Sequence, residues 1–137
     1  MTNESLLKSF IEDVWNRKNF DAVEKYVDNE YSVSVDTDDP WEGMVLNNQE
    51  YIKRLHYSFD SFPDMHFDIQ SSVEDGDYVA ITWILTGTNL GKIGELPPTG
   101  KKIRANGVTV YQFSNGKVCG HTQVFDRITV AKQLGFI

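Results

Sequence analysis

Hydrophobic residues in the first half of the chain recur at spacings of three and four, the period of an amphipathic helix. Residues 4–18 carry the longest such stripe, made of Leu6, Leu7, Phe10, Ile11, Val14 and Trp15. A shorter helix is predicted next, with Phe20, Val23, Tyr26 and Val27 on one face. A third is predicted to begin near Asn47 or Asn48, where Glu50 can complete a capping box on Asn47, and to end before Pro63.

Alternation with a period of two, typical of strands, appears briefly at residues 31–35 and takes over after Pro63. Residues 36–40 are predicted to form a turn or loop, and residues 91–100 a longer loop. Strands are predicted over residues 65–73, 78–88, 101–113 and 117–126. Turns at residues 74–77 and 114–116 separate them, and Ile128, Ala131 and Leu134 indicate a short closing helix ended by Gly135.

This order of elements predicts an α+β fold in which helices cover one face of a curved antiparallel sheet. The last four strands follow one another directly and should form an antiparallel meander. Strands of more than ten residues must twist and coil, so the sheet and helices should enclose a cone-shaped interior. We expect residues 1–137 to form one domain, with a ligand pocket inside the cone.

Composition and charge narrow the possible partners. The chain has a net charge of −7 and scattered basic residues, which argues against nucleic-acid binding. We expect no membrane association, because no apolar run is long enough to span a bilayer. The start of the sequence lacks a signal-peptide pattern, and Cys119 is the single cysteine, so a cytoplasmic location is predicted.

Asp126 and His121 are the candidate catalytic residues. An aspartate in an apolar pocket can act as a base next to a carbonyl group, and a nearby histidine can polarise that carbonyl or keep the aspartate ionised. Asp126 could equally be the N-cap of the closing helix, and His121 could lie on a half-exposed sheet face. Strict alternation places the two side chains on opposite faces, so a bulge would be needed to bring them into one pocket.

Further side chains are candidates for binding a substrate. Four of them are aromatic. Among these four, only Trp41 lies in a predicted loop, where no periodic pattern of core residues requires an aromatic side chain. The complete set is Trp15, Trp41, Phe59, His66, Trp83, Asn106 and Gln123. No metal site is predicted: Asp36, Asp38 and Asp39 resemble part of a calcium loop, but its glycine and distal glutamate are missing.

Four segments in the second half resemble the SnoaL-like polyketide cyclases and ester cyclases of the NTF2-like superfamily. They begin at Phe62-Pro63-Asp64, Gly87-Thr88-Asn89, Leu96-Pro97-Pro98 and Asn115-Gly116-Lys117, the last running on through His121 and Asp126 to Gly135. The resemblance implies a cone-shaped (cystatin-like) α+β barrel and intramolecular aldol condensation without a metal or other cofactor. It also assigns general acid/base chemistry to Asp126, with His121 five residues before it.

Two positions depart from the family pattern. Many members have tryptophan at the position of Thr122 and histidine at the position of Asn89, and either change could alter the pocket or remove the cyclase activity. The sequence therefore supports two main hypotheses: a small-molecule enzyme acting on an apolar carbonyl compound by cyclisation or isomerisation, and a non-catalytic ligand-binding or dimerisation module. A homodimer is compatible with both, and the resemblance implies one.

Overall fold

The chain begins with a helix that changes its period halfway along. The computed structural model describes residues 1–137, and α1 (Asn3–Phe10) is capped by the Thr2 side chain. The backbone then passes into a π-helical segment, η1 (Ile11–Asn16), which buries Trp15. Asn16 exchanges two hydrogen bonds with the backbone of Phe67 in the sheet. The helix predicted over residues 4–18 is thus present, but its wider second half turns Trp15 and Asn16 toward the sheet.

Two short segments, η2 (Phe20–Ala22) and α2 (Val23–Tyr26), lead into strand β1 (Val27–Asp36). Strand β2 (Val45–Leu46) pairs with β1, and helix α3 (Asn48–Ser61) follows. The predicted capping box of α3 is confirmed, because Asn47 and Glu50 each accept a hydrogen bond from the other's backbone amide. Strand β1 extends to Asp36, a residue that the sequence pattern had placed in a turn.

The second half is made of long strands and one closing helix. These are β3 (His66–Asp75), β4 (Tyr78–Thr88), β5 (Lys102–Ser114), β6 (Lys117–Phe125) and α4 (Arg127–Leu134). Helix α4 ends at Gly135, whose φ of 82° lies in the left-handed region that favours glycine. The predicted strands, turns and closing helix are all confirmed within a few residues at their ends.

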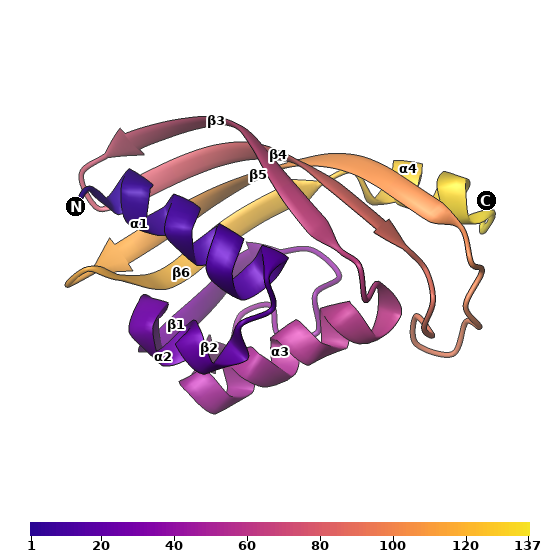
Figure 1. Ribbon diagram of the computed structural model, residues 1–137, viewed down its shortest axis with the longest axis horizontal. Helices are drawn as coiled ribbons and strands as arrows, with labels where there is room; N and C mark the ends of the chain where they lie inside the picture. The colour runs from indigo at the N-terminus through magenta and orange to yellow at the C-terminus, as the bar shows by residue number, and fades with distance from the viewer.

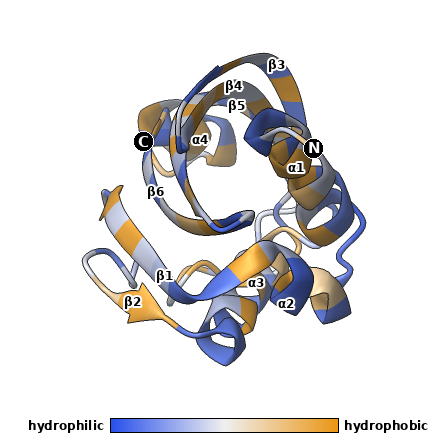
Figure 2. Cartoon of the chain, turned by 90° about the vertical axis from the view of Figure 1, so that its left-hand side faces the viewer, coloured by the Kyte–Doolittle hydropathy of each residue, from blue (hydrophilic) through white to orange (hydrophobic).

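The strands form one curved, unclosed sheet in the order β2-β1-β6-β5-β4-β3. Strands β3 to β6 make the expected antiparallel meander, and β1 joins it by pairing in parallel with β6. Figure 1 shows the long strands arching over the helices, with α4 at the far end of β5 and β6. Figure 2, turned by 90°, shows the meander curling with α1 on its concave side.

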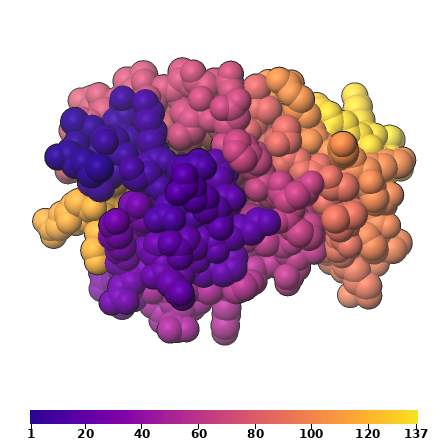
Figure 3. Space-filling view, viewed as in Figure 1, coloured from indigo at the N-terminus to yellow at the C-terminus, as the bar shows by residue number.

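Alternating burial along β4 and β5 defines an inner and an outer face of the sheet. Residues on the inner face join the helices in one continuous apolar cluster that extends from Leu7 in α1 to Leu134 in α4. Figure 3 shows the N-terminal segments (indigo to purple) lying against α3 (magenta) on one surface, with the C-terminal end (yellow) at the opposite end of the molecule. The inner face therefore carries both the core and, toward α4, the cavity described below.

Candidate functional site

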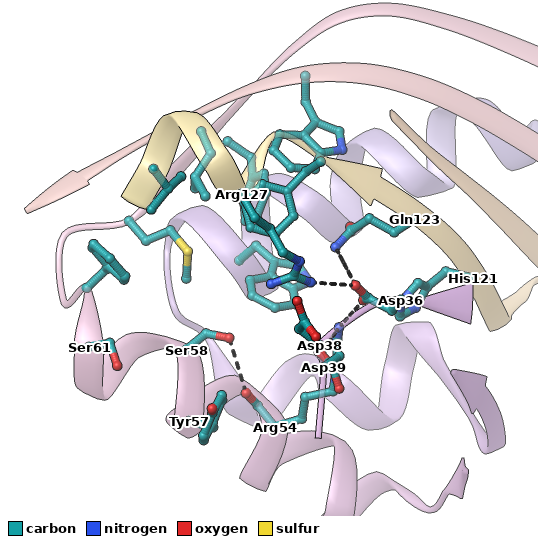
Figure 4. A pocket seen from close by; sticks show the side chains of 18 of the residues that line it. Asp36, Asp38, Asp39, Arg54, Tyr57, Ser58, Ser61, His121, Gln123 and Arg127 are labelled. Carbon is teal, nitrogen blue, oxygen red and sulfur yellow. Dashed lines mark hydrogen bonds and ion pairs between the residues drawn. The ribbon is translucent and has the colours of Figure 1, made fainter. Parts of the chain in front are cut away.

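A cavity of about 380 Å³ lies between the inner face of the sheet, η1, α3 and α4. Of its 25 lining residues, 15 are hydrophobic, so most of its wall is apolar. The polar lining residues are concentrated where the ends of β1 and β6 meet α3 and α4, as the close view in Figure 4 shows. The cavity thus has an apolar body and one charged end.

Aromatic rings in edge-to-face contact form part of the apolar wall. The ring centroid of Phe67 lies 5.4 Å from that of Trp15 and 5.1 Å from that of Trp83. The Trp83 indole lies directly over Gly107 on the neighbouring strand, where an added Cβ would fall 2.2 Å from the ring. Glycine at this position therefore allows the indole to lie flat against β5 and leaves the space in front of it open.

The charged end is organised around Asp36, the last residue of β1, which is 1% exposed. Its Oδ2 accepts hydrogen bonds from His121 Nε2 at 2.8 Å and from Arg54 Nη2 at 3.1 Å. Its Oδ1 accepts one from Arg127 Nη2 at 3.1 Å, and the Gln123 amide lies 3.3 Å from Oδ2. Donors from α3, β6 and α4 thus converge on one buried carboxylate (Figure 4).

Arg54 holds a second carboxylate next to the first. Its Nη2 lies 3.0 Å from Asp39 Oδ2, and its Nε donates to the same oxygen at 3.1 Å. Burial favours the neutral form of the guanidinium, but nearby Tyr51, Asp39 and Asp36 raise the pKa of Arg54, so it stays charged. The cation fixes the loop that follows β1 and compensates the buried charge of Asp36.

His121 is held between a carboxylate and a phenol. Its Nε2 faces Asp36, and its Nδ1 lies 2.6 Å from the hydroxyl oxygen of Tyr31. Burial raises the pKa of Tyr31 well above its usual value, so the phenol keeps its proton and donates a hydrogen bond to Nδ1. A neutral imidazole protonated on Nε2 is the tautomer that satisfies both contacts.

Opposing influences set the charges of the Asp36–His121 pair. Burial lowers the pKa of His121 and outweighs the hydrogen bond to Asp36, so the imidazole is neutral. Burial works to raise the pKa of Asp36, but the hydrogen bond from His121 and the charge of Arg54 outweigh it, and the pKa lies below its usual value. At neutral pH the site therefore contains an ionised carboxylate beside a neutral imidazole.

A chain of hydrogen bonds links the apolar wall to the charged end. Trp83 Nε1 donates to Thr109 Oγ1 at 2.8 Å, and Thr109 donates to Gln123 Oε1 at 2.8 Å. The orientation of the Gln123 amide follows from this chain, because its oxygen accepts from Thr109 and its nitrogen is left to donate to Asp36. Trp83 therefore contributes to the position of Gln123 as well as to the cavity wall.

A bulge in β1 brings Asp36 to the inner face. Strand β1 is paired with β6 so that Val33 lies opposite His121 and Asp36 opposite Gln123, with a register shift between Val33 and Val35. Tyr31 and Val33 point inward, Val35 is exposed, and Asp36 is buried again. The extra residue reverses the alternation and turns the Asp36 carboxylate toward His121.

The structure does not bring Asp126 and His121 together. From Gly107↔Phe125 to Gln112↔Gly120 the pairing of β5 with β6 is regular, so His121 and Gln123 face the cavity and Asp126 lies outside it. Asp126 is exposed and caps α4, where it accepts hydrogen bonds from the amide and hydroxyl of Thr129. No bulge lies between His121 and Asp126 in β6, whereas the bulge between Val33 and Val35 in β1 turns a different carboxylate, that of Asp36, to the inner face.

The predicted binding residues separate into two groups. Trp15, Trp83 and Gln123 line the cavity. Phe59 is buried against the Trp15 ring behind the wall, and Trp41 packs edge-to-face on Tyr57. His66 and Asn106 are exposed, His66 at the start of β3 and Asn106 on the outer face of β5. These last four residues do not line the cavity.

Four residues of the charged end were not predicted from the sequence: Tyr31, Asp36, Arg54 and Arg127. Arg54 had a signal in the sequence, because it lies between Tyr51 and Leu55 on the buried face of α3. Asp36 had none, since alternation from Val33 would have turned it outward. Arg127 follows Asp126 directly and lies within the segment that resembles the family, but the resemblance assigned a role to Asp126 and none to Arg127.

Both departures from the family pattern lie away from the cavity. Asn89 is fully buried and fixes the loop between β4 and β5, donating to the carbonyls of Ser61 and Gly91 and accepting from Thr99. Thr122 is exposed on the outer face of β6. Neither position therefore changes the groups that face a ligand in this cavity.

Comparisons with known proteins agree with this architecture. The family described as SnoaL-like polyketide cyclase matches residues 5–134. A crystal structure of a proposed polyketide cyclase from Acidithiobacillus ferrooxidans is 40% identical, with a TM-score of 0.90 over 96% of this chain and 93% of that one. IdmH, a proposed polyketide cyclase from Streptomyces antibioticus, is 20% identical with a TM-score of 0.82 over 98% and 99% of the two chains.

A third solved structure shares the fold under a different description. AclR, a proposed hydroxylase from Streptomyces galilaeus, is 21% identical with a TM-score of 0.81, covering 98% of this chain and 82% of its own. No curated protein matches the sequence significantly. None of the helices has the length and apolar character needed to cross a bilayer.

Proposed function

The chain belongs to the SnoaL-like polyketide cyclase family, and we propose that it is a cyclase- or isomerase-type enzyme whose acid/base group is Asp36, supported by His121. The observation that carries this proposal is the buried carboxylate at the charged end of an otherwise apolar cavity. An apolar body suits a small, largely apolar molecule, and a charged end suits the carbonyl group at which it reacts.

The proposed reaction begins with proton transfer from carbon to Asp36. The carboxylate takes a proton from the carbon next to a substrate carbonyl, and the electron pair moves onto the carbonyl oxygen. The guanidinium of Arg127 or Arg54 stabilises the resulting enolate oxygen. In an isomerisation, Asp36 returns the proton to another atom of the substrate. In a cyclisation, the enolate carbon bonds to a second carbonyl carbon, and Asp36 gives the proton to the new alkoxide.

His121 and Tyr31 have positioning roles in this scheme. The Nε2 proton of the neutral imidazole keeps one carboxylate oxygen engaged, and the Tyr31 hydroxyl holds the opposite ring nitrogen. This arrangement fixes the tautomer and leaves Asp36 as the ionised partner. The acid/base group and the cation that stabilises the enolate are thus both side chains of this protein.

Exchange of carbon-bound protons tests the proposal directly. The probe is 4-phenylbutan-2-one in D₂O, whose protons next to the carbonyl can be followed by NMR. We expect the protein to accelerate the exchange and Asp36→Asn to reduce the acceleration by about 100-fold or more, in the range usual for a positioned acid/base group. Asp126→Asn should retain it. Equal exchange rates in the wild-type protein and in Asp36→Asn would rule Asp36 out as the base.

Folding has to be measured alongside exchange, because Asp36→Asn leaves buried cations without their partner. Asp36→Glu supplies the control, since it keeps the charge and moves the carboxylate by one methylene. If Asp36→Glu folds with a normal thermal transition but exchanges protons slowly, the position of the carboxylate matters for chemistry. If both variants fold and exchange as the wild type does, the proposal is wrong.

Ligand binding without turnover is the second candidate function. It is favoured by the saturation of the polar cluster: no buried side-chain nitrogen or oxygen lacks a hydrogen-bond partner. A carboxylate with all its partners in place can be a structural element of the core. Under this alternative, 4-phenylbutan-2-one would bind, for example with a change in tryptophan fluorescence, but its protons would exchange no faster than in buffer.

We also propose that two copies associate through the outer face of the sheet, in the cytoplasm. Val35, Val108 and Val124 on this face are 47%, 46% and 70% exposed. Exposed apolar residues on neighbouring strands are typical of an interaction surface. Light scattering coupled to size exclusion should give twice the monomer mass, and Val124→Glu should reduce it toward one copy, whereas a monomeric wild-type protein would contradict the proposal.

A further inference from the structure

The two oxygens of the Asp36 carboxylate are held very differently. Oδ2 is bound by His121 and Arg54, whose side chains are 3% and 8% exposed, at 2.8 and 3.1 Å. Oδ1 is bound by Arg127, whose side chain is 36% exposed, at 3.1 Å, with Gln123 more distant at 3.5 Å. Removal of Arg127 alone would leave Oδ2 fully engaged and open Oδ1 to the cavity.

Arg127 is placed so that it can move without disturbing the core. It is the first residue of α4, and its guanidinium carbon lies 4.3 Å from the centroid of the Phe125 ring at the cavity wall. Asp36 is its ion-pair partner, whereas Arg54 is tied to both Asp36 and Asp39. Figure 4 shows Arg127 reaching Asp36 from the α4 side, opposite Arg54 on α3.

We infer, building on the proposed function, that Arg127 is an exchangeable partner of Asp36 and determines which ligands bind. A ligand hydroxyl takes the place of Arg127 at Oδ1, and a ligand carbonyl oxygen accepts a hydrogen bond from the released guanidinium. The ligand thereby enters between the two residues and replaces their ion pair with two hydrogen bonds to charged groups.

The charges around the cavity argue against an anionic ligand. Asp36, Asp38 and Asp39 face it with Arg54 and Arg127, so three carboxylates and two guanidinium groups leave one excess negative charge. An anionic ligand would be repelled, whereas a neutral compound that carries a hydroxyl donor and a carbonyl acceptor matches the pair. Displacement of a cation from Oδ1 also makes Asp36 more basic at the moment when the ligand is in place.

Three matched ligands separate the two predicted contacts. The compound 4-hydroxy-4-phenylbutan-2-one has the hydroxyl and the carbonyl, 4-phenylbutan-2-one lacks the hydroxyl, and 1-phenylbutan-1-ol lacks the carbonyl. Affinities measured by calorimetry should place the hydroxyketone about tenfold above each of the other two, since each contact is a hydrogen bond to a charged group. The measurement uses binding alone and needs no turnover.

Arg127→Gln is the decisive variant, and Lys132→Gln on the same helix is its charge-matched control. In Arg127→Gln the preference for the hydroxyketone over 1-phenylbutan-1-ol should fall from about tenfold to near one, because the shorter, uncharged glutamine cannot make the charge-assisted hydrogen bond to the carbonyl. The preference over 4-phenylbutan-2-one should persist, because Oδ1 still accepts the hydroxyl. Lys132→Gln should bind all three compounds as the wild type does.

Other outcomes overturn the inference. It is wrong if the tenfold preference over 1-phenylbutan-1-ol survives in Arg127→Gln, if Lys132→Gln removes it equally, or if none of the three compounds saturates the protein at millimolar concentration. Its failure is distinguishable from failure of the proposed function. Loss of proton exchange in Asp36→Asn together with unchanged binding preferences in Arg127→Gln would retain the catalytic carboxylate and reject the exchange of Arg127.

Discussion

Two aspartates near the same end of the sheet differ in almost every physical respect. Asp36 is 1% exposed and accepts hydrogen bonds from two arginines, a histidine and a glutamine. Asp126 is exposed and accepts hydrogen bonds from Thr129, in the first turn of its own helix. Burying a carboxylate costs free energy that donors from several elements must offset, and such a carboxylate can then act on a ligand in the cavity. A helix cap is exposed and requires only the amides of residues next to it in the sequence.

The comparison also separates long-range from local interactions. Asp36 lies 85 positions from His121 and 91 from Arg127, so its environment exists only in the folded chain. Asp126 lies three positions from Thr129 and finds its partner wherever α4 forms. Mutations in the two clusters should therefore have effects of very different size.

Removal of Arg54 should have the largest effect. Arg54→Gln leaves Asp36 and Asp39 without the cation that both share, and breaking a buried ion pair costs about 3–5 kcal/mol. The free energy of unfolding in urea measures this loss. Lys53→Gln removes the same charge from the exposed neighbouring position and should change stability by less than about 0.5 kcal/mol. Similar losses in both variants would mean that the Asp36 cluster contributes no more than a surface charge.

Gly107→Ala should disturb the cluster from the opposite side. The new Cβ would fall 2.2 Å from the Trp83 ring, so the indole must leave its place and lose its hydrogen bond to Thr109. Overpacking of this kind costs about 1–3 kcal/mol. Combining it with Trp83→Phe should restore part of that stability, which a double-mutant cycle of urea unfolding measures. Strictly additive losses would show that the indole and Gly107 are not in direct conflict.

Stability should also depend on pH through His121. Burial lowers the pKa of His121 below the value of about 6.5 found in an unfolded chain. As the pH falls below that value, the unfolded chain takes up a proton that the folded protein does not, so stability is present above about pH 6.5 and is lost toward acid. The slope for one such group reaches at most about 1.4 kcal/mol per pH unit.

The pH effect is measured by urea unfolding between pH 7.5 and about pH 5, above the range in which carboxylates titrate. His121→Gln should flatten the slope, although it lowers the overall stability. His56→Gln removes a histidine from an exposed position on α3, outside the Asp36 cluster, and is the control for the loss of an imidazole. A slope that persists in His121→Gln would assign the titration to another group.

The distinction between local and long-range contacts also explains which features could be predicted from the sequence. Periodicity located every helix and strands β3 to β6, because the inner and outer faces of β4 and β5 differ along their whole length, but it located only residues 31–35 of β1. Turn chemistry located the hairpin at residues 114–116, and the capping box located the start of α3. These are local signals, and each is carried by residues that are close in the chain.

The charged end depends on information that local patterns do not contain. The inward turn of Asp36 follows from a bulge in β1 and from parallel pairing with a strand about 90 residues away. His121 was a candidate catalytic residue through the family resemblance and Gln123 a candidate binding residue, but no local pattern pairs either of them with Asp36. The resemblance to a family drew attention to Asp126, which shares a segment of sequence with His121 but not a face of the sheet.

The smallest effect is expected at Asp126. Asp126→Ala removes the side chain that accepts from the Thr129 amide, so α4 should fray at its start and the unfolding midpoint should fall slightly. Asp126→Ser should recover most of that change, because serine can cap the same amide. Both variants should exchange the protons of 4-phenylbutan-2-one as fast as the wild type does, since Asp126 does not line the cavity. A large loss of exchange in Asp126→Ser with normal unfolding would reverse the ranking of the two aspartates and make Asp126 the acid/base group.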